Sequence, residues 1–229
     1  MSSEVELPVA SVEKLREAVE IVRDSLLTEV TIATDPIAPK AVFKLLVFRE
    51  SLSWRIYEIA NSAVEALDRG ELLSSMILCR SLQETVALNF HLLREVEKCA
   101  NAGDVSTLDA SAMQMLLGSR EIDARYQSLN ILTAVDRLDR AFPSYRNLYN
   151  GLSEYCHPNF AGVANCFAHH RRFGDVSLGR YPQGAGRYEL TIKRSLMISL
   201  LLFQDHYNSA ADVMPQVIKL CEEHFESRS

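Results

Sequence analysis

The chain has 229 residues, of which 48% are hydrophobic and 24% are charged, and its formal net charge is −6. A chain of this size and balance buries a sizeable core without disulfide or metal cross-links. The acidic net charge argues against a general binder of nucleic acid or of anionic membranes. Nine glycines and seven prolines are few for this length, which argues against a sandwich, a barrel or a collagen-like chain and favours long helices.

Apolar residues at helical spacing, bounded by capping residues and prolines, predict most of the helices in chain order. The main helices are expected over residues 11–30, 39–68, 71–100, 104–117, 121–141, 143–157 and 192–211, with short continuations over 159–168 and 213–225. Residues 1–10 read as a frayed tail, and the two prolines of residues 31–40 indicate a connector. The predicted fold is all-α, an antiparallel bundle of about six or seven helices.

Residues 169–191 differ from the rest because they are rich in glycine and lack a helical stripe. Two extended runs, Asp175–Leu178 and Arg187–Thr191, flank a Gly/Pro turn, which predicts a hairpin or a long loop. We interpret the whole chain, 1–229, as a single domain. Its parts are an N-terminal helix with a connector, a bundle core, a basic loop and C-terminal helices, expected at 1–38, 39–168, 169–191 and 192–229.

The cysteines and the first residues of the chain indicate the cellular compartment. The five cysteines are scattered and never form a C-x-x-C pair, which favours small buried residues in a reducing cytosol over disulfides or a zinc site. The first eleven residues have no signal-peptide pattern. The most apolar run, Leu196–Phe203, is far shorter than the roughly 20 residues of a membrane span. We expect a cytoplasmic protein with no membrane contact, no cofactor and no metal.

The segment from Leu72 to Leu93 carries only two formal charges, Arg80 and Glu84, in a helix that is apolar nearly all round. Such a helix belongs in the centre of a bundle, so the charged pair is expected to be partly buried. Two interpretations stay open. In the first, Arg80 and Glu84 form an i,i+4 ion pair that compensates both charges and fixes the helix register. In the second, the pair lines an internal polar pocket and orients a third group.

A second group of polar residues lies in the predicted helix that ends with the segment LSEYCHP, residues 152–158. Ser153 and His157 lie on one face of the predicted helix, and Pro158 breaks the helix at His157. His157 is interpreted either as a cation at a helix end or as a group that exchanges protons near neutral pH. Glu154 and His157 have the Glu-x-x-His spacing of di-metal bundles, but no second such pair exists, so no metal site is expected.

The segments RSLQE (80–84) and YNGLSEYCHP (149–158) together resemble a family of bacterial helical domains of unknown function. Members of that family carry an R-S-x-x-E helix and a helix end of the form L-S-x-x-x-H-P. The family is distantly similar to the HEPN-like bundles, many of which are dimeric, metal-independent ribonucleases of defence and toxin systems. The resemblance covers roughly residues 40–205 and implies an all-α fold and a homodimer.

The matching motif positions imply a shared site of Arg80, Glu84, Ser153 and His157, with Tyr149 as a neighbour. In this interpretation Glu84 orients Arg80 or the His157 imidazole, His157 is the general acid or base, and Arg80 holds a phosphate or carboxylate. The chain lacks the Arg followed by His after four to six residues that marks catalytic HEPN domains. The resemblance therefore supports the fold more than nuclease activity.

A local excess of basic residues marks the segment 169–194, which has six basic and two acidic residues. The candidate anion-binding residues in it are Arg171, Arg172, Arg180 and Arg187. The segment is interpreted as a solvated loop, as a dimer contact against an acidic face, or as a contact for RNA or another anion.

The sequence thus predicts a helical binding or interaction module with a small polar pocket, linked to a defence or stress system. The alternative is a divergent HEPN-like metal-independent ribonuclease in which His157 is the general acid or base.

Overall fold

The computed structural model describes residues 10–31, 40–121 and 125–226. Within these residues the fold has eight helices and one antiparallel strand pair, with the bounds α1 Val12–Asp24, α2 Lys40–Asp68, α3 Leu72–Ala102, α4 Leu108–Leu117, α5 Ile131–Ala141, α6 Tyr145–Cys156, α7 Ala164–Phe167, β1 Ala168–Arg172, β2 Asp175–Leu178 and α8 Gly186–Glu226. The predicted all-α bundle with a short hairpin insertion is confirmed. The predicted tail, apart from Ala10, and most of the predicted connector lie outside the described residues.

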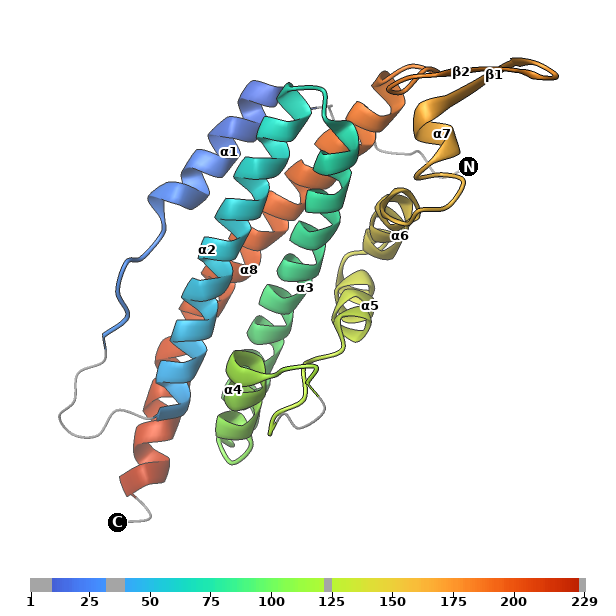
Figure 1. The fold of residues 1–229 in the computed structure, drawn as a ribbon. Coiled ribbons are helices and arrows are strands. Elements are labelled where there is room, and N and C mark those ends of the chain that lie inside the picture. Colours follow the sequence, from blue (N-terminus) through green and yellow to red (C-terminus); the bar gives the residue numbers. More distant parts are fainter. Residues whose placement is uncertain (1–9, 32–39, 122–124, 227–229) are drawn as a thin grey trace, which may run out of the picture.

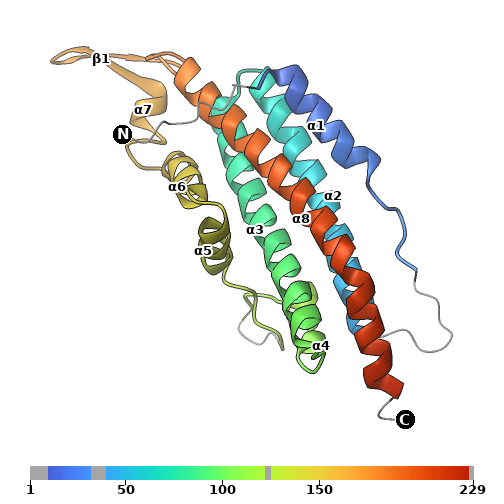
Figure 2. The ribbon, with the colours of Figure 1, turned by 180° about the vertical axis from the view of Figure 1, so that it is seen from behind.

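Four long or amphipathic helices, α1, α2, α3 and α8, lie side by side along the molecule (Figures 1 and 2). Helix α2 runs antiparallel to α3, because only the short turn around Gly70 joins them. Helices α5 and α6 then return the chain along the other side of α3. Helix α8 therefore runs in the same direction as α3 (Figure 2).

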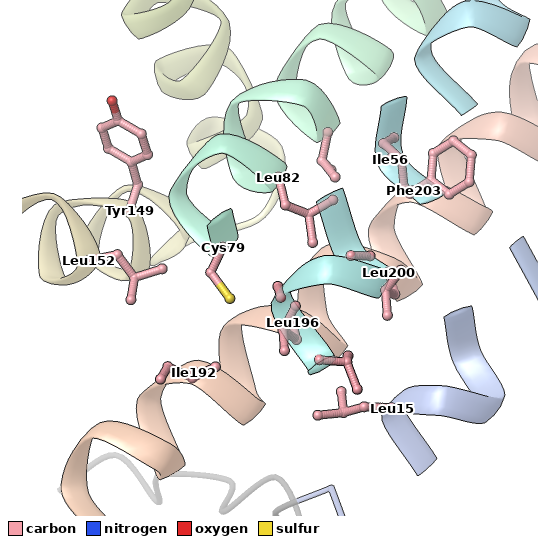
Figure 3. Close-up of a cluster of buried hydrophobic side chains, with 14 of the residues drawn as sticks. Leu15, Ile56, Cys79, Leu82, Tyr149, Leu152, Ile192, Leu196, Leu200 and Phe203 are labelled. Atoms are coloured by element: carbon pink, nitrogen blue, oxygen red, sulfur yellow. The ribbon is translucent and has the colours of Figure 1, made fainter. Parts of the chain in front are cut away.

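Helix α3 is the central element, as its nearly uninterrupted apolar sequence predicts. It packs against α2, α8, α5 and α6. Figure 3 shows part of the main hydrophobic cluster, in which side chains of α1, α2, α3, α6 and α8 gather, among them Leu15, Ile56, Leu82, Leu152 and Leu196. A second cluster joins the N-terminal part of α2 to α4, the end of α3 and the end of α8. Packing against these four helices holds α3 in place, which makes it a suitable scaffold for a site.

Local signals explain several helix ends. Ser11 Oγ accepts a hydrogen bond from Lys14 N and caps α1. Gly103 ends α3 with a left-handed φ of 63°, a conformation that glycine adopts without strain. The residue before α3, Glu71, makes no side-chain cap. Instead, the hydroxyl of Tyr181 accepts from Leu73 N at 2.7 Å, so the segment before α8 caps α3.

Two predicted helices are shorter than expected. Helix α1 ends at Asp24 rather than near Val30, because the next backbone N–H and the Ser25 hydroxyl both bond back into the last turn. Helix α5 begins at Ile131 rather than at Glu121, because the Asn130 side chain accepts from Leu132 N and fixes the start there.

The predicted hairpin has a different pairing. Asp175–Leu178 pairs with the preceding residues Ala168–Arg172, and the turn between them has Gly174 at φ 77°. Arg187–Thr191, expected as a strand, lies in the first turns of α8. The prediction of that second strand is wrong. Tyr188 and Ile192 are buried in the main hydrophobic cluster, and this packing favours a helix that begins at Gly186. The hairpin projects beyond the end of the bundle (Figures 1 and 2).

The two predicted C-terminal helices form a single helix, α8, with Pro215 inside it. Proline removes one backbone hydrogen bond, but residues beyond it, such as Val217 and Cys221, are buried in the second hydrophobic cluster. This burial favours continuation of the helix. No helix within the described ranges combines the length and the apolar character needed to cross a membrane.

Candidate functional site

Arg80 of α3 lies at the centre of a hydrogen-bonded network that joins α3 to α6. Its Nε donates to Ser153 Oγ at 3.0 Å, and its Nη2 donates to the Tyr149 hydroxyl at 3.0 Å. The same Nη2 lies 3.3 Å from Glu84 Oε1, and the Tyr149 hydroxyl donates to that oxygen at 2.9 Å. The structure thus brings together four of the five residues that the sequence suggested for a shared site.

The network is partly shielded from solvent, since the Arg80 and Glu84 side chains are 32% and 26% exposed. Partial burial of Arg80 opposes its charge, but the hydrogen bond with Tyr149 and the nearby Glu84 carboxylate outweigh it and raise the pKa of Arg80. The guanidinium also lies 5.3 Å from the centroid of the Tyr149 ring. Arg80 is therefore a permanently charged group held in a fixed place.

His157 lies outside this network. Its side chain is exposed, and among the described residues it has no hydrogen-bond or ion-pair partner. Helix α6 ends at Cys156, and His157 has an extended backbone (φ −87°, ψ 144°), as the following Pro158 favours. The expectation of an imidazole enclosed beside Arg80 is therefore corrected, because the turn at Pro158 leaves the ring in solvent.

A second arginine reaches α3 from the opposite side. Arg55 of α2 donates from Nε to Thr85 Oγ1 and from Nη2 to Ser81 Oγ, both at 3.2 Å. Thr85 and Ser81 are sequence neighbours of Glu84 and Arg80, so the two guanidinium groups flank the same stretch of α3. Neutral hydroxyls orient Arg55 without neutralising it, and within the described part of the chain it has no carboxylate partner.

Two adjoining pockets extend along this stretch and form what we call the α3 groove. The smaller, of about 230 Å³, lies between α2, α3 and α4, and the larger, of about 560 Å³, lies between α3, α5 and α6. Their shared lining residues are Glu84, Arg120, Ser128, Leu129 and Ile131. Arg55 lines the smaller pocket, whereas Arg80 and Tyr149 line the larger one. Among the described residues, the lining therefore has three arginines and one carboxylate.

Arg120 stands where the two pockets meet. It follows α4 in the loop that leads towards α5, and its side chain is exposed. No other described residue forms an ion pair or hydrogen bond with its guanidinium. By contrast Arg146, close to Tyr149 on α6, is paired with Asp136 at 2.7 Å. Arg140 of α5, which lines neither pocket, also has no ion pair among the described residues, so Arg55 and Arg120 are distinguished by their place in the lining of the groove.

The four arginines expected to bind anions at the basic segment are distributed over three places. Arg171 and Arg172 end strand β1 and are exposed, with Arg172 Nε 3.7 Å from Asp175. Arg180 lines a separate pocket of about 270 Å³ with Tyr181 and residues at the start of α3. Arg187 belongs to α8 and donates to the Tyr155 hydroxyl at 3.1 Å. They do not form one shared cluster.

No family model matches this chain, and neither the curated proteins nor the solved structures searched gave a match. The resemblance carried by residues 80–84 and 149–158 therefore stays a prediction. Within the described ranges, no group of three or more His, Cys, Asp or Glu side chains is placed to hold a metal ion. The function has to be argued from the geometry of the groove.

Arg55 and Arg120 are the two groove arginines that the sequence did not single out. Each is an ordinary arginine in a charged stretch of sequence, with no motif around it. One weak signal exists for Arg55, because the predicted 39–68 helix places it two or more turns from the helix ends, beside the apolar stripe. Arg120 offers no comparable signal, since a loop position carries no periodicity.

Replacing Tyr149 by phenylalanine is expected to lower the free energy of unfolding by about 1–2 kcal/mol, because its hydroxyl bonds both Arg80 and Glu84. Urea unfolding measures the difference. Tyr57→Phe is the matched control, since in the described part of the chain that hydroxyl makes no hydrogen bond. Equal stabilities of the two variants would contradict a network that joins α3 to α6.

Proposed function

We propose that this protein is a helical binding module whose ligand site is the α3 groove. The observation that carries the proposal is the excess of positive charge in the groove. Arg55, Arg80 and Arg120 line it, and Glu84 supplies the one carboxylate among the described lining residues. Arg146, beside the groove, has a carboxylate partner in Asp136. Within the described part of the chain, two of these three arginines have no carboxylate partner, which favours a ligand that supplies negative charge.

A purely structural role accounts for part of the network. The bonds from Arg80 to Glu84, Tyr149 and Ser153 join α3 to α6 and satisfy a partly buried charge. That role does not account for Arg55 and Arg120, which add positive charge at the same groove without a counter-charge in the described chain. A binding role accounts for all three arginines.

The ribonuclease alternative is less well supported by the geometry. It needs a general acid or base next to the anion-binding arginine, and the exposed His157 forms no hydrogen bond or ion pair with the network. Metal-independent cleavage of RNA that is lost in His157→Ala would replace our proposal with this one. The homodimer, the cytoplasmic location, the link to a defence or stress system and the binding of RNA by the basic hairpin all stay predictions.

A binding screen with a groove-blocking variant tests the proposal. Ser128 lines both pockets and is partly buried, so Ser128→Trp is expected to fill the groove. The wild-type protein is screened by thermal shift against a panel of small anions, cations and neutral metabolites. We expect anions to raise the melting temperature of the wild type and to leave that of Ser128→Trp unchanged.

The control is Asn208→Trp, which adds the same side chain at an exposed position on α8, a helix that lines neither pocket. This variant is expected to respond to the anions as the wild type does. Anions that stabilise Ser128→Trp as much as the wild type would place their site elsewhere and overturn the proposal. The absence of any stabilising anion would overturn it as well.

A further inference from the structure

The two halves of the α3 groove differ in chemistry. Three apolar side chains, Phe48, Leu88 and Met115, line only the smaller pocket, where they lie among polar side chains that include Arg55, Thr85 and Gln114. The larger pocket is mainly polar, with Arg80, Tyr149, Ser128 and Asn130 in its lining. One end of the groove thus suits an apolar group, whereas the junction and the other end suit a charged one.

The arginines mark where the charged group belongs. Arg120 and Glu84 line both pockets, so they stand at the junction. Arg55 lies on the side of the small pocket and Arg80 on the side of the large one. An anionic group at the junction therefore has a guanidinium on each side of it. Guanidinium groups recognise planar carboxylates and phosphates through paired N–H donors.

The carboxylate of Glu84 restricts how many negative charges the ligand can carry. Both of its contacts, with Arg80 Nη2 and with the Tyr149 hydroxyl, are made through Oε1. A fixed carboxylate at the junction repels a ligand with several negative charges spread along its length. The carboxylate repels a single anionic head as well, but three arginines outnumber it in the described lining, so the net positive charge favours one compact head and leaves the rest of the ligand uncharged.

We infer that the groove binds an amphiphilic organic anion, with one carboxylate or phosphate-ester head at the junction and an apolar body in the smaller pocket. This inference rests on the proposed function and adds the chemical class of the ligand. A volume of about 230 Å³ next to Phe48 and Leu88 accommodates a short alkyl or aryl body. Burial of that body adds affinity that a bare ion does not have.

A matched series of probes tests the inference by isothermal titration calorimetry. Hexyl phosphate and hexanoate have both a head and a body, inorganic phosphate and acetate have the head alone, and hexanol has the body alone. We expect hexyl phosphate or hexanoate to bind at least about tenfold more tightly than its bare ion, since burying two methylenes is sufficient for that gain. The better of the two identifies the head as a phosphate ester or a carboxylate.

Two variants separate the head from the body. Arg55→Gln is expected to weaken the better amphiphile about tenfold or more, and Arg94→Gln, a surface arginine of α3 paired with Glu97, is expected to leave it unchanged. Leu88→Ala is expected to reduce the advantage of the amphiphile over its bare ion. Leu117→Ala, at an exposed leucine outside both pockets, is the control for that change.

The outcomes distinguish this inference from the proposed function. Equal binding of the amphiphile and its bare ion, binding of hexanol as tight as that of hexanoate, or no saturable binding of any probe up to about 10 mM would overturn the amphiphilic class. If another anion of the panel still binds and Ser128→Trp abolishes that binding, the proposed function stands without the inference. If no ligand responds to Ser128→Trp, both fail.

Discussion

Replacing Glu50 by leucine is expected to lower the free energy of unfolding by about 3–5 kcal/mol, the cost of a buried arginine without its counter-charge. Glu50 and Arg49 are 4% and 8% exposed, and Arg49 Nη1 lies 2.6 Å from Glu50 Oε1. The Tyr207 hydroxyl of α8 donates to both carboxylate oxygens, at 3.2 and 3.0 Å, and the Arg49 guanidinium stacks on its ring. Loss of the carboxylate leaves the arginine without a counter-charge, bonded only to the Tyr207 carbonyl oxygen at 3.2 Å, and leaves the tyrosine hydroxyl unpaired.

The tyrosine remains a donor throughout the neutral range, because burial raises the pKa of Tyr207 to about 12. The double variant Arg49→Leu/Glu50→Leu is expected to be more stable than Glu50→Leu alone, since it removes the unpaired charge. Urea unfolding followed by circular dichroism measures all the variants. Glu58→Leu, at an exposed position of the same helix, is expected to change the free energy by less than about 0.5 kcal/mol.

A Glu50→Leu variant as stable as Glu58→Leu would contradict this account, because it would mean that water reaches the Arg49 guanidinium. A double variant less stable than Glu50→Leu would contradict it as well. In that case packing around the long arginine side chain, and not its charge, would dominate at this position.

The long central helices were predictable because their signals are local. The apolar stripe of α2 and the uniformly apolar α3 follow from spacing alone, and Gly70 and Gly103 mark the ends of these helices with left-handed backbones. The same reasoning failed where tertiary contacts outweigh a local signal. Pro215 reads as a helix start, yet burial on both sides of it keeps α8 continuous.

The network that joins α3 to α6 was predictable for a similar reason. Arg80 and Glu84 stand out as charges in an apolar helix, and Tyr149 and Ser153 share one face of the next amphipathic helix. The predicted role of the fifth residue, His157, depended on how the chain turns after Cys156. Pro158 signals that a turn exists but not its direction, so the sequence could not place the imidazole.

The remaining residues of the groove were not predictable, because they arise from the packing of distant segments. Arg55 meets α3 through hydroxyls of Ser81 and Thr85, a contact that depends on the rotation of α2 against α3. Arg120 lies in a loop, whose path no periodicity fixes. The positive charge of the groove is therefore a property of the tertiary structure, although every arginine in it is visible in the sequence.

Acidification below about pH 6.5 is expected to lower the free energy of unfolding, because two buried histidines resist protonation in the folded protein. Burial, aided by the nearby charge of Arg137, lowers the pKa of His91 against the opposing effect of Glu95. His91 Nδ1 lies 3.0 Å from Arg137 Nη1. Since arginine only donates, this nitrogen has to be the unprotonated acceptor.

His206 of α8 is the second such group. Burial lowers the pKa of His206, and the neighbouring Asp205 only partly opposes this effect. Its Nδ1 is buried and has no partner among the described residues, and its ring packs 4.9 Å from the ring of Phe90. A proton on this ring would bring a charge into an apolar contact between α3 and α8.

The sign of the effect follows from proton uptake. Above about pH 6.5 both imidazoles are neutral whether the chain is folded or unfolded, so they contribute no pH dependence. Below it the unfolded chain takes up protons that the folded protein excludes. The free energy of unfolding then falls by up to about 1.4 kcal/mol per pH unit for each histidine, until the lowered pKa of the folded state is reached.

Urea unfolding at a series of pH values, from about 7 to about 5, compares the wild type with His91→Gln/His206→Leu. Glutamine keeps an acceptor for Arg137, and leucine fills the place of the His206 ring without a titratable group. The double variant is expected to lose most of the slope that the wild type shows in this range. Parallel curves would mean that both imidazoles take up protons as readily in the folded protein as in water, and that the α3–α8 contact admits solvent.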